Sequence, residues 1–234
     1  MKVEIWSDIM CPFCYVGKKH FESALAALPF KDKITVEWKS FQLDPTLPAE
    51  GADISTKEYL VQRKGMPMEQ VEGMLNHLKQ AGESVGIVFN QDKSIPVNTF
   101  RAHRFIHFAQ EQGKGNEAEE ALFYAHFTAG KNVGNVDELV SLGEQIGLDA
   151  TAVRAFLLTD EQSDEVKADI VEAQTLGISG VPFFVLDRKY GISGAQPVEA
   201  FVEALTQAYQ ESQPGFEMKG DNGAGACGPD GCEI

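Results

Sequence analysis

Two cysteines near the start of the chain have the spacing of a redox dithiol. Cys11 and Cys14 follow an apolar-alternating run over residues 3–7 and come directly before a predicted helix. A thiol in the first turn of a helix meets unpaired backbone N–H groups and the positive end of the peptide dipoles, which favour its thiolate. Pro12, between the cysteines, supplies a helical φ without needing a donor. We therefore expect Cys11, the more exposed sulfur, to attack disulfides and Cys14 to resolve the mixed disulfide.

A proline near the other end of the chain is the second chemical signal. Pro182 follows Val181 at the start of an apolar run over residues 181–186 that predicts a buried strand. Proline cannot donate to a sheet ladder, so Pro182 must occupy an edge or a special turn. A cis peptide bond here would leave the backbone groups of Val181 free to pair with an extended substrate. The residues alone leave the isomer open, because cis bonds are uncommon even before proline.

The elements that must position these residues follow the order of a thioredoxin fold once a helical block is set aside. The predicted order is strand 3–7, helix 16–28, strand 33–41, helical block 48–158, helix 161–176 ending at Gly177, strand 181–186, a pairing segment at 192–193, and a last helix carrying apolar positions 198–205.

Several local signals predict helices inside the block. Residues 55–58 form a capping box, and Asn135 stands at capping-box spacing from Glu138. Apolar residues recur at helical spacing over 71–78 and 102–109. Three further helices are predicted over 117–127, 136–146 and 151–158.

Composition and charge exclude some classes of partner. The chain has 234 residues, 43% of them hydrophobic, and a formal net charge of −15, so phosphates would be repelled and no nucleic-acid partner is expected. No apolar run approaches the roughly 20 residues that cross a bilayer, so we expect no membrane span. The first ten residues lack the pattern of a secretory signal, which favours a cytoplasmic location and disfavours a structural disulfide.

The motifs together resemble one branch of a known superfamily. The resemblance rests on residues 11–14 after a first strand, the long helical insertion, residues 180–184, residues 98–104 and residues 193–196. These features resemble the DsbA-like thioredoxin superfamily, in particular its FrnE-type dithiol-disulfide oxidoreductases. The implied fold is an α/β thioredoxin fold with a large all-helical insertion. The expected domains are 1–47 with 159–212, the insertion 48–158, and a flexible tail 213–234.

The resemblance also implies roles for individual residues. Cys11 would be the attacking thiol, Cys14 the resolving thiol, and Pro182, in a cis bond, a residue that contacts substrate. We assign further substrate contacts to Pro12, Phe13 and Val181. The implied activity is exchange of disulfides with protein or peptide thiols, with no required cofactor and with glutathione as a candidate redox partner.

Two departures from the superfamily keep alternatives open. Secreted relatives often carry histidine where Phe13 stands, so a strongly oxidising character does not transfer. Glutathione-dependent isomerases carry serine where Cys11 stands. The alternatives are such an isomerase, acting on a small aromatic or polyketide-like substrate, and a protein whose thiols bind a soft metal ion.

A second cysteine pair lies in the tail. Cys227 and Cys232 are separated by a turn-forming Gly-Pro-Asp-Gly spacer. About 14 flexible residues span on the order of 20 Å, so this pair could exchange with the first at an effective concentration near millimolar. Four thiolates could instead enclose zinc, or the tail thiols could be incidental. We favour an auxiliary redox role.

Two other groups of residues have a chemical and a structural interpretation. His103 and His107 lie one helical turn apart, but no third metal ligand is evident, so packing or hydrogen bonding is favoured and no metal site is predicted. Four apolar residues are candidates for a substrate groove or for ordinary core: Phe13, Met66, Met68 and Phe183.

Overall fold

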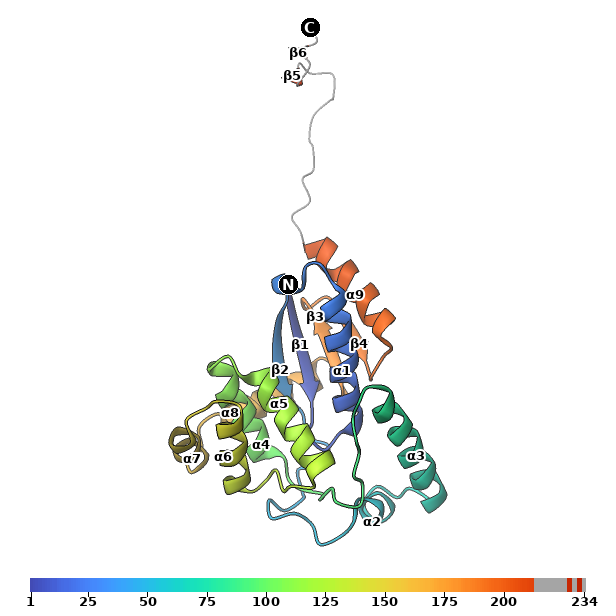
Figure 1. Cartoon of the computed structure of the whole chain (residues 1–234), viewed down its shortest axis with the longest axis vertical. Helices are drawn as coiled ribbons and strands as arrows, with labels where there is room; N and C mark the ends of the chain where they lie inside the picture. The colour runs from blue at the N-terminus through green and yellow to red at the C-terminus, as the bar shows by residue number, and fades with distance from the viewer. Residues whose placement is uncertain (213–226, 229–230, 233–234) are drawn as a thin grey trace.

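The computed structural model describes residues 1–212, 227–228 and 231–232, and its centre is a four-stranded mixed sheet (Figure 1). The strands lie in the order β2-β1-β3-β4. β1 (Lys2–Ser7) pairs in parallel with β2 (Thr35–Ser40) and antiparallel with β3 (Phe183–Leu186), and β4 (Tyr190–Ser193) is antiparallel to β3. This sheet and its helices confirm the predicted thioredoxin fold.

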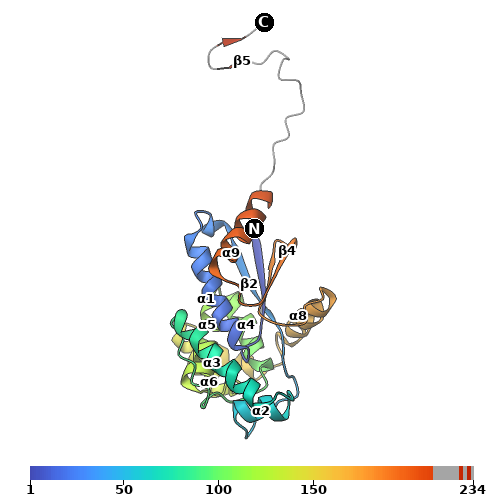
Figure 2. The same cartoon turned by 90° about the vertical axis from the view of Figure 1, so that its right-hand side faces the viewer.

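The alternating residues of β1 place different helices on the two faces of the sheet. Val3 and Ile5 lie in the large core together with α1 (Pro12–Ala27) and α9 (Val198–Ser212). Trp6 instead packs with Ala173 on α8 (Ser163–Thr175). Figure 2 shows α1 and α9 on one side of the strands and α8 on the other. Because all of these β1 side chains are fully buried, β1 is the central strand on which the site is built.

All regular elements of the insertion are helices, and they lie around the end of β1 that leads into Cys11 (Figure 1). The 3-10 turn η1 (Lys31–Lys33) precedes β2, and the elements of the insertion all follow β2 in the chain. They are α2 (Thr56–Gln62), α3 (Met68–Ser84), α4 (Phe100–Glu111), α5 (Gly115–Phe123), the π-helical η2 (Tyr124–Ala129), α6 (Val136–Gln145) and α7 (Ala150–Leu157).

The predicted helix signals are found where the sequence placed them. The Ser55 hydroxyl accepts from the Glu58 N–H, and the Glu58 carboxylate accepts from the Ser55 N–H, so the capping box is confirmed. The Asn135 side chain accepts from two N–H groups at the start of α6. Gly177 has φ +75°, the left-handed conformation expected after α8.

Two helix boundaries differ from the prediction. The first helix begins at Pro12 rather than at residue 16, because the two cysteines form its first turn. The predicted α-helix 117–127 changes after Phe123 into the π-helical η2, which ends at Gly130 with φ +68°. An added Cβ at Gly130 would lie 2.5 Å from Lys93 Cβ, so a side chain there would be both strained and crowded.

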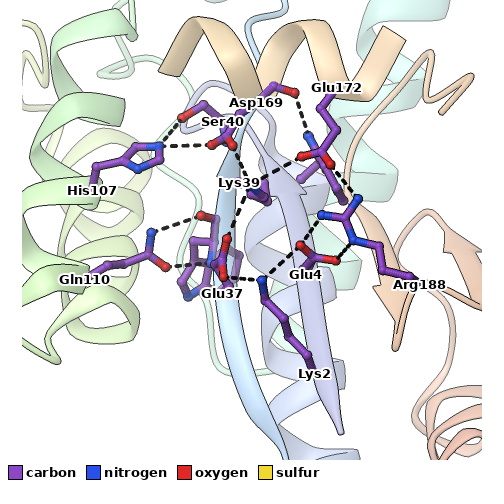
Figure 3. A network of polar contacts seen from close by, with 12 residues as sticks. Lys2, Glu4, Glu37, Lys39, Ser40, His107, Gln110, Asp169, Glu172 and Arg188 are labelled. Carbon is purple, nitrogen blue, oxygen red and sulfur yellow. Dashed lines mark hydrogen bonds and ion pairs between the residues drawn. The ribbon is translucent and has the colours of Figure 1, made fainter. Parts of the chain in front are cut away.

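The outer edge of β2 is covered by a side chain. The Gln110 amide accepts from the Trp38 N–H at 2.7 Å and donates to the Trp38 carbonyl at 3.0 Å (Figure 3). It therefore pairs with both main-chain groups of Trp38, as a neighbouring strand would.

A polar network ties α8 to β1, β2 and the turn between β3 and β4 (Figure 3). The Asp169 carboxylate accepts from Lys39 Nζ at 2.7 Å and from the Ser40 N–H at 2.9 Å. Arg188, after β3, forms ion pairs with Glu172 on α8 and with the buried Glu4 on β1. The network fixes α8 across the sheet face that carries Trp6.

The C-terminal residues include a short antiparallel pairing. β5 (Cys227–Gly228) pairs with β6 (Gly231–Cys232), and the register sets Cys227 opposite Cys232. Of the predicted flexible tail 213–234, residues 213–226, 229–230 and 233–234 lie outside the described residues. Among the helices that the structure describes, none combines the length and apolar character needed to cross a bilayer.

Candidate active site

The first cysteine sits at the N-terminal cap of α1. Cys11 has φ −90° and ψ 107°, and Pro12 is the first helical residue. The Cys11 N–H donates to the Asp8 carbonyl at 2.8 Å, and the Cys14 N–H donates to the Cys11 carbonyl at 3.0 Å. This turn brings Cys11 and Cys14 close together as free thiols. The arrangement matches the sequence-based expectation of a dithiol at a helix N-terminus.

The proline loop lies directly against the first sulfur. The Cys11 thiol donates to the Val181 carbonyl at 3.4 Å. The Val181–Pro182 bond is cis, as the resemblance implied. The Gly194 N–H donates to the Pro182 carbonyl at 2.8 Å, so the end of β4 holds the loop in place. Residues 170 positions apart in the chain thus form one site.

The relative exposure of the two cysteines follows the prediction. Cys11 is more exposed than Cys14, as expected, but its exposure is only 7%, against 1% for Cys14. Neighbouring groups of the fold therefore cover most of Cys11.

A glycine that sequence reasoning missed allows α1 and the proline loop to approach each other. A Cβ added at Gly17 would lie 3.0 Å from Pro182 Cγ and 3.4 Å from Ala195 Cα. Gly17 stands one helical turn after Cys14, on the side of α1 that meets the loop. The only sequence signal was a glycine inside a predicted helix, which often marks a close approach.

Cys14 lies in an environment that keeps it protonated. Burial raises the pKa of the Cys14 thiol well above its ordinary value, and the neighbouring Cys11 side chain raises it further. The Asp8 backbone and the Ser7 hydroxyl act in the opposite direction without reversing the shift. Cys14 therefore needs to lose a proton before it can attack a mixed disulfide.

Asp8 connects the cysteine turn to the insertion. Burial alone would raise the pKa of Asp8, but the neighbouring His103 side chain and the Leu43 N–H outweigh it and hold the pKa below its usual range. His103 Nε2 lies 3.5 Å from Asp8 Oδ1, and the Leu43 N–H donates to Asp8 Oδ2 at 2.7 Å. The strand end, the segment after β2 and α4 therefore meet at one carboxylate.

An apolar cavity of about 90 Å³ borders the cysteine turn. Its wall includes Pro12 and Phe13, so it begins next to the reactive sulfurs. Of the four predicted groove residues, Phe13 lines this cavity, whereas Met66, Met68 and Phe183 do not, and Met68 is exposed. The other lining side chains that are mainly apolar are Met10, Tyr59, Leu60, Met74, Leu75, Leu78, Phe89, Pro96 and Phe127.

The two histidines of α4 face different carboxylates. His103 faces Asp8, whereas His107 Nε2 lies 3.0 Å from Asp169 Oδ2. His107 is therefore hydrogen-bonded, as interpreted, whereas His103 is buried beside Asp8 and its Nε2 has no hydrogen-bond partner among the described residues. Within residues 1–212 and the two described tail segments, no three His, Cys, Asp or Glu side chains are grouped to hold a metal ion.

A helix-capping dithiol facing a cis-proline loop on this sheet defines a thioredoxin-fold thiol protein. The chain matches the DSBA-like thioredoxin domain family over residues 2–206 and belongs to that family. It is similar to a probable DsbA oxidoreductase from Streptomyces coelicolor, with 43% identity, a TM-score of 0.85, and coverage of 100% of this chain and 99% of that one.

Two further proteins extend the comparison. The chain is 30% identical to the protein YwbO of Bacillus subtilis (strain 168) over 208 residues, which cover 87% of this chain and 95% of that protein. It shares its fold with the cytosolic disulfide reductase DsbM from Pseudomonas aeruginosa solved with GSH. That match has 16% identity, a TM-score of 0.63, and coverage of 90% of this chain and 100% of DsbM.

Proposed function

We propose that the protein is a cytoplasmic dithiol-disulfide oxidoreductase or isomerase that acts on peptide and protein substrates through Cys11 and Cys14. The observation that carries this proposal is the Cys11 thiol at the cap of α1, within 3.4 Å of the carbonyl that precedes Pro182. The Val181 backbone offers pairing groups to an extended substrate.

The proposed reaction proceeds through one mixed disulfide. The Cys11 thiolate attacks a substrate disulfide, forms a bond to one substrate sulfur and releases the other as a thiolate. Cys14 then loses its proton and attacks Cys11 Sγ, so that the second substrate sulfur leaves with its electron pair and takes up a proton. The protein is oxidised to the Cys11–Cys14 disulfide while the substrate is reduced, and the reverse steps oxidise a dithiol.

Trapping tests this proposal directly. Cys14→Ala should accumulate a covalent mixed disulfide between Cys11 and its substrate in cells, because resolution is blocked. Cys11→Ser should form no such adduct and should lose insulin reduction and the refolding of scrambled protein. Full activity in the Cys11→Ser variant would overturn the proposal. Saturable glutathione binding without disulfide turnover would instead favour the isomerase alternative.

Glutathione is the proposed low-molecular-weight redox partner, and we propose that no bound cofactor is required. The support is the fold shared with DsbM, a cytosolic disulfide reductase that was solved with GSH. The FrnE-type branch of the family is the proposed assignment, as is the cytoplasmic location. A redox-sensitive reporter fused to the full chain in cells would test the location.

We also propose that Cys227 and Cys232 form an auxiliary redox pair. The support is their register: residues directly opposite in an antiparallel pair have Cα atoms about 4.5–5.5 Å apart, within the range that a disulfide spans. In the full chain, the tail dithiol would reduce the Cys11–Cys14 disulfide. Replacing both tail cysteines with serine should then slow steady-state turnover, while the first attack by Cys11 remains unchanged. Equal turnover would overturn this role.

A further inference from the structure

The apolar cavity beside the cysteine turn has no part in the exchange steps described so far. Its volume is about 90 Å³, and its wall includes Pro12 and Phe13, the two residues between the cysteines. Most of the remaining wall comes from the insertion, from α2, α3, η2 and residues 89–96. Val181 and Pro182 are not part of the wall, so the cavity is separate from the proline loop.

The wall runs from partly exposed residues to buried ones. The half-buried members include Met10, Pro12, Phe13, Leu60 and Met74. The buried members include Tyr59, Leu75, Leu78 and Phe127. Consecutive residues of a chain have Cα atoms about 3.8 Å apart. Since the half-buried end contains the cysteine turn, the neighbour of a substrate cysteine bonded to Cys11 would lie beside this end of the cavity.

The cavity offers an occupant apolar contact and no charge. Among the polar side chains of the wall, Thr56 donates to the Ser94 carbonyl at 3.1 Å, and Gln91 donates to the Leu75 carbonyl at 2.9 Å. Burial lowers the pKa of His126 to about 4, so this ring is neutral at pH 7. In the described part of the chain, the wall contains no carboxylate, ammonium or guanidinium group. A charged side chain would therefore lose its hydration there without gaining a partner.

The size and the lining of the cavity narrow the choice of occupant. An apolar cavity of about 150 Å³ takes a benzene ring, so this smaller one suits a slender aliphatic chain better than an aromatic side chain. Four aromatic rings from separate segments line it: Phe13, Tyr59, Phe89 and Phe127. A thioether sulfur makes favourable contacts with aromatic rings, and an unbranched chain adapts to an irregular space. These properties together favour methionine.

We propose that this cavity is a subsite for the side chain of a methionine that adjoins the substrate cysteine. Cys11 bonds to the substrate sulfur while the methionine side chain lies among the aromatic rings of the wall. The subsite names a substrate class: peptides and proteins in which the cysteine of the exchanged disulfide has a methionine neighbour. This inference rests on the proposed function, and one experiment separates the two.

Release of a coloured thiolate measures attack by Cys11 alone. The full chain carrying Cys14→Ala, Cys227→Ser and Cys232→Ser keeps Cys11 as its one cysteine. It is mixed with short peptides whose cysteine is bonded to a coloured aromatic thiol. The Cys11 thiolate bonds to the peptide sulfur, the peptide–aromatic disulfide breaks, and the aromatic thiolate leaves with the electron pair. The neighbour of the peptide cysteine is glycine, methionine, norleucine, tryptophan or aspartate, placed before the cysteine in one series and after it in another.

In one of the two series, methionine should raise the rate constant about tenfold over glycine, near the lower end of what burial of such a side chain supplies. Norleucine, in which a methylene replaces the sulfur, should react about threefold more slowly than methionine. Tryptophan and aspartate should react no faster than glycine, because the first exceeds the cavity and the second brings a charge.

The possible results separate the two proposals. If no peptide releases colour faster with Cys11 present than with Cys11→Ser, the proposed function is overturned. If methionine and glycine peptides react equally fast in both series, the subsite is overturned and the proposed function stands. Equal rates for methionine and norleucine would overturn the assignment of the subsite to methionine.

Filling the cavity should remove the preference. In Met74→Trp an indole replaces a half-buried wall residue of α3, and the ratio of the methionine rate to the glycine rate should fall from about ten to about one. Gln80→Trp, at an exposed position of the same helix, should keep the ratio. If Met74→Trp does not fold, Gly82→Ala takes its place and should lower the ratio, because the added Cβ would lie 2.5 Å from Phe89 Cδ2 and that ring must move. Gly73→Ala, whose Cβ meets nothing within 4 Å, is its control. An unchanged ratio in a folded Met74→Trp or Gly82→Ala variant would overturn the inference.

Discussion

Asp169 on α8 and Glu119 on α5 are both buried acidic residues, but their carboxyl groups differ in hydrogen bonding. Asp169 has a partner on every side: Lys39, Ser40 and His107 all contact its carboxylate. Glu119 has none at either oxygen. A fully paired buried charge stabilises a particular arrangement of elements, whereas an unpaired buried charge lowers the stability of the folded state. The comparison separates a paired buried carboxylate from an unpaired one within a single domain.

The pKa directions express the same contrast. Burial alone would raise the pKa of Asp169, but His107 and Lys39 outweigh it and hold the pKa below its usual range. The stability that Asp169 contributes is therefore present above the ordinary carboxyl pKa and is lost as pH falls through its folded value. For Glu119 the folded pKa is raised, so its contribution is present at low pH and is lost as pH rises to about 7.

The largest expected effect is the loss of the paired charge. Asp169→Ala should lower the free energy of unfolding by about 3–5 kcal/mol at pH 7, because Lys39 and the Ser40 N–H lose their acceptor. Denaturant unfolding would measure the change. The rate of insulin reduction per folded molecule should not change. Glu37→Gln is the control, because that partly exposed residue should cost less than about 1 kcal/mol.

The second prediction reverses the sign. Glu119→Gln should increase stability relative to the parent chain by up to about 3 kcal/mol above pH 7, since it removes the cost of ionising a buried carboxyl group. The difference should develop between about pH 4.3, where an unfolded glutamate ionises, and pH 7. Urea unfolding at several pH values would measure it. A stability difference independent of pH would contradict the contrast between Asp169 and Glu119.

The smallest expected effect concerns geometry rather than charge. Gly17→Ala should slow attack by Cys11 about tenfold, because the new Cβ pushes against Pro182 and displaces the loop that faces the sulfur. Stability should change little, since alanine also favours the helix by about 1 kcal/mol. The rate of attack on an aromatic disulfide that releases a coloured thiolate would measure the first effect, and a thermal melt would measure the stability. Gly73→Ala on α3, where an added Cβ meets nothing within 4 Å, is the matched control.

The order of elements and the cysteine turn were predictable because local signals specify them. The capping box at residues 55–58, the cap at Asn135 and the stop at Gly177 each act within one helical turn, and all three are present. The cis bond at Pro182 was expected from the family resemblance and not from its own residues.

Long-range contacts set what the sequence did not reveal. Glu119 looks like an ordinary surface position of a predicted helix, and only its packing against β1 and α4 shows that it is buried. The covering of Cys11 depends on groups that lie far along the chain, such as Val181. The π-helical η2, which ends at Gly130, depends on packing against the segment around Asn90, whose N–H donates to the Phe127 carbonyl.

The Gln110 amide has a consequence for how copies of this protein meet one another in a crowded solution. β2 is an outermost strand, and free main-chain groups on such a strand invite a foreign strand to add. Because the Gln110 side chain is hydrogen-bonded to both the N–H and the carbonyl of Trp38, it takes the place that a fifth strand would occupy there. At this position the edge of the sheet therefore offers an intruding chain no free main-chain donor or acceptor with which to begin a fibre.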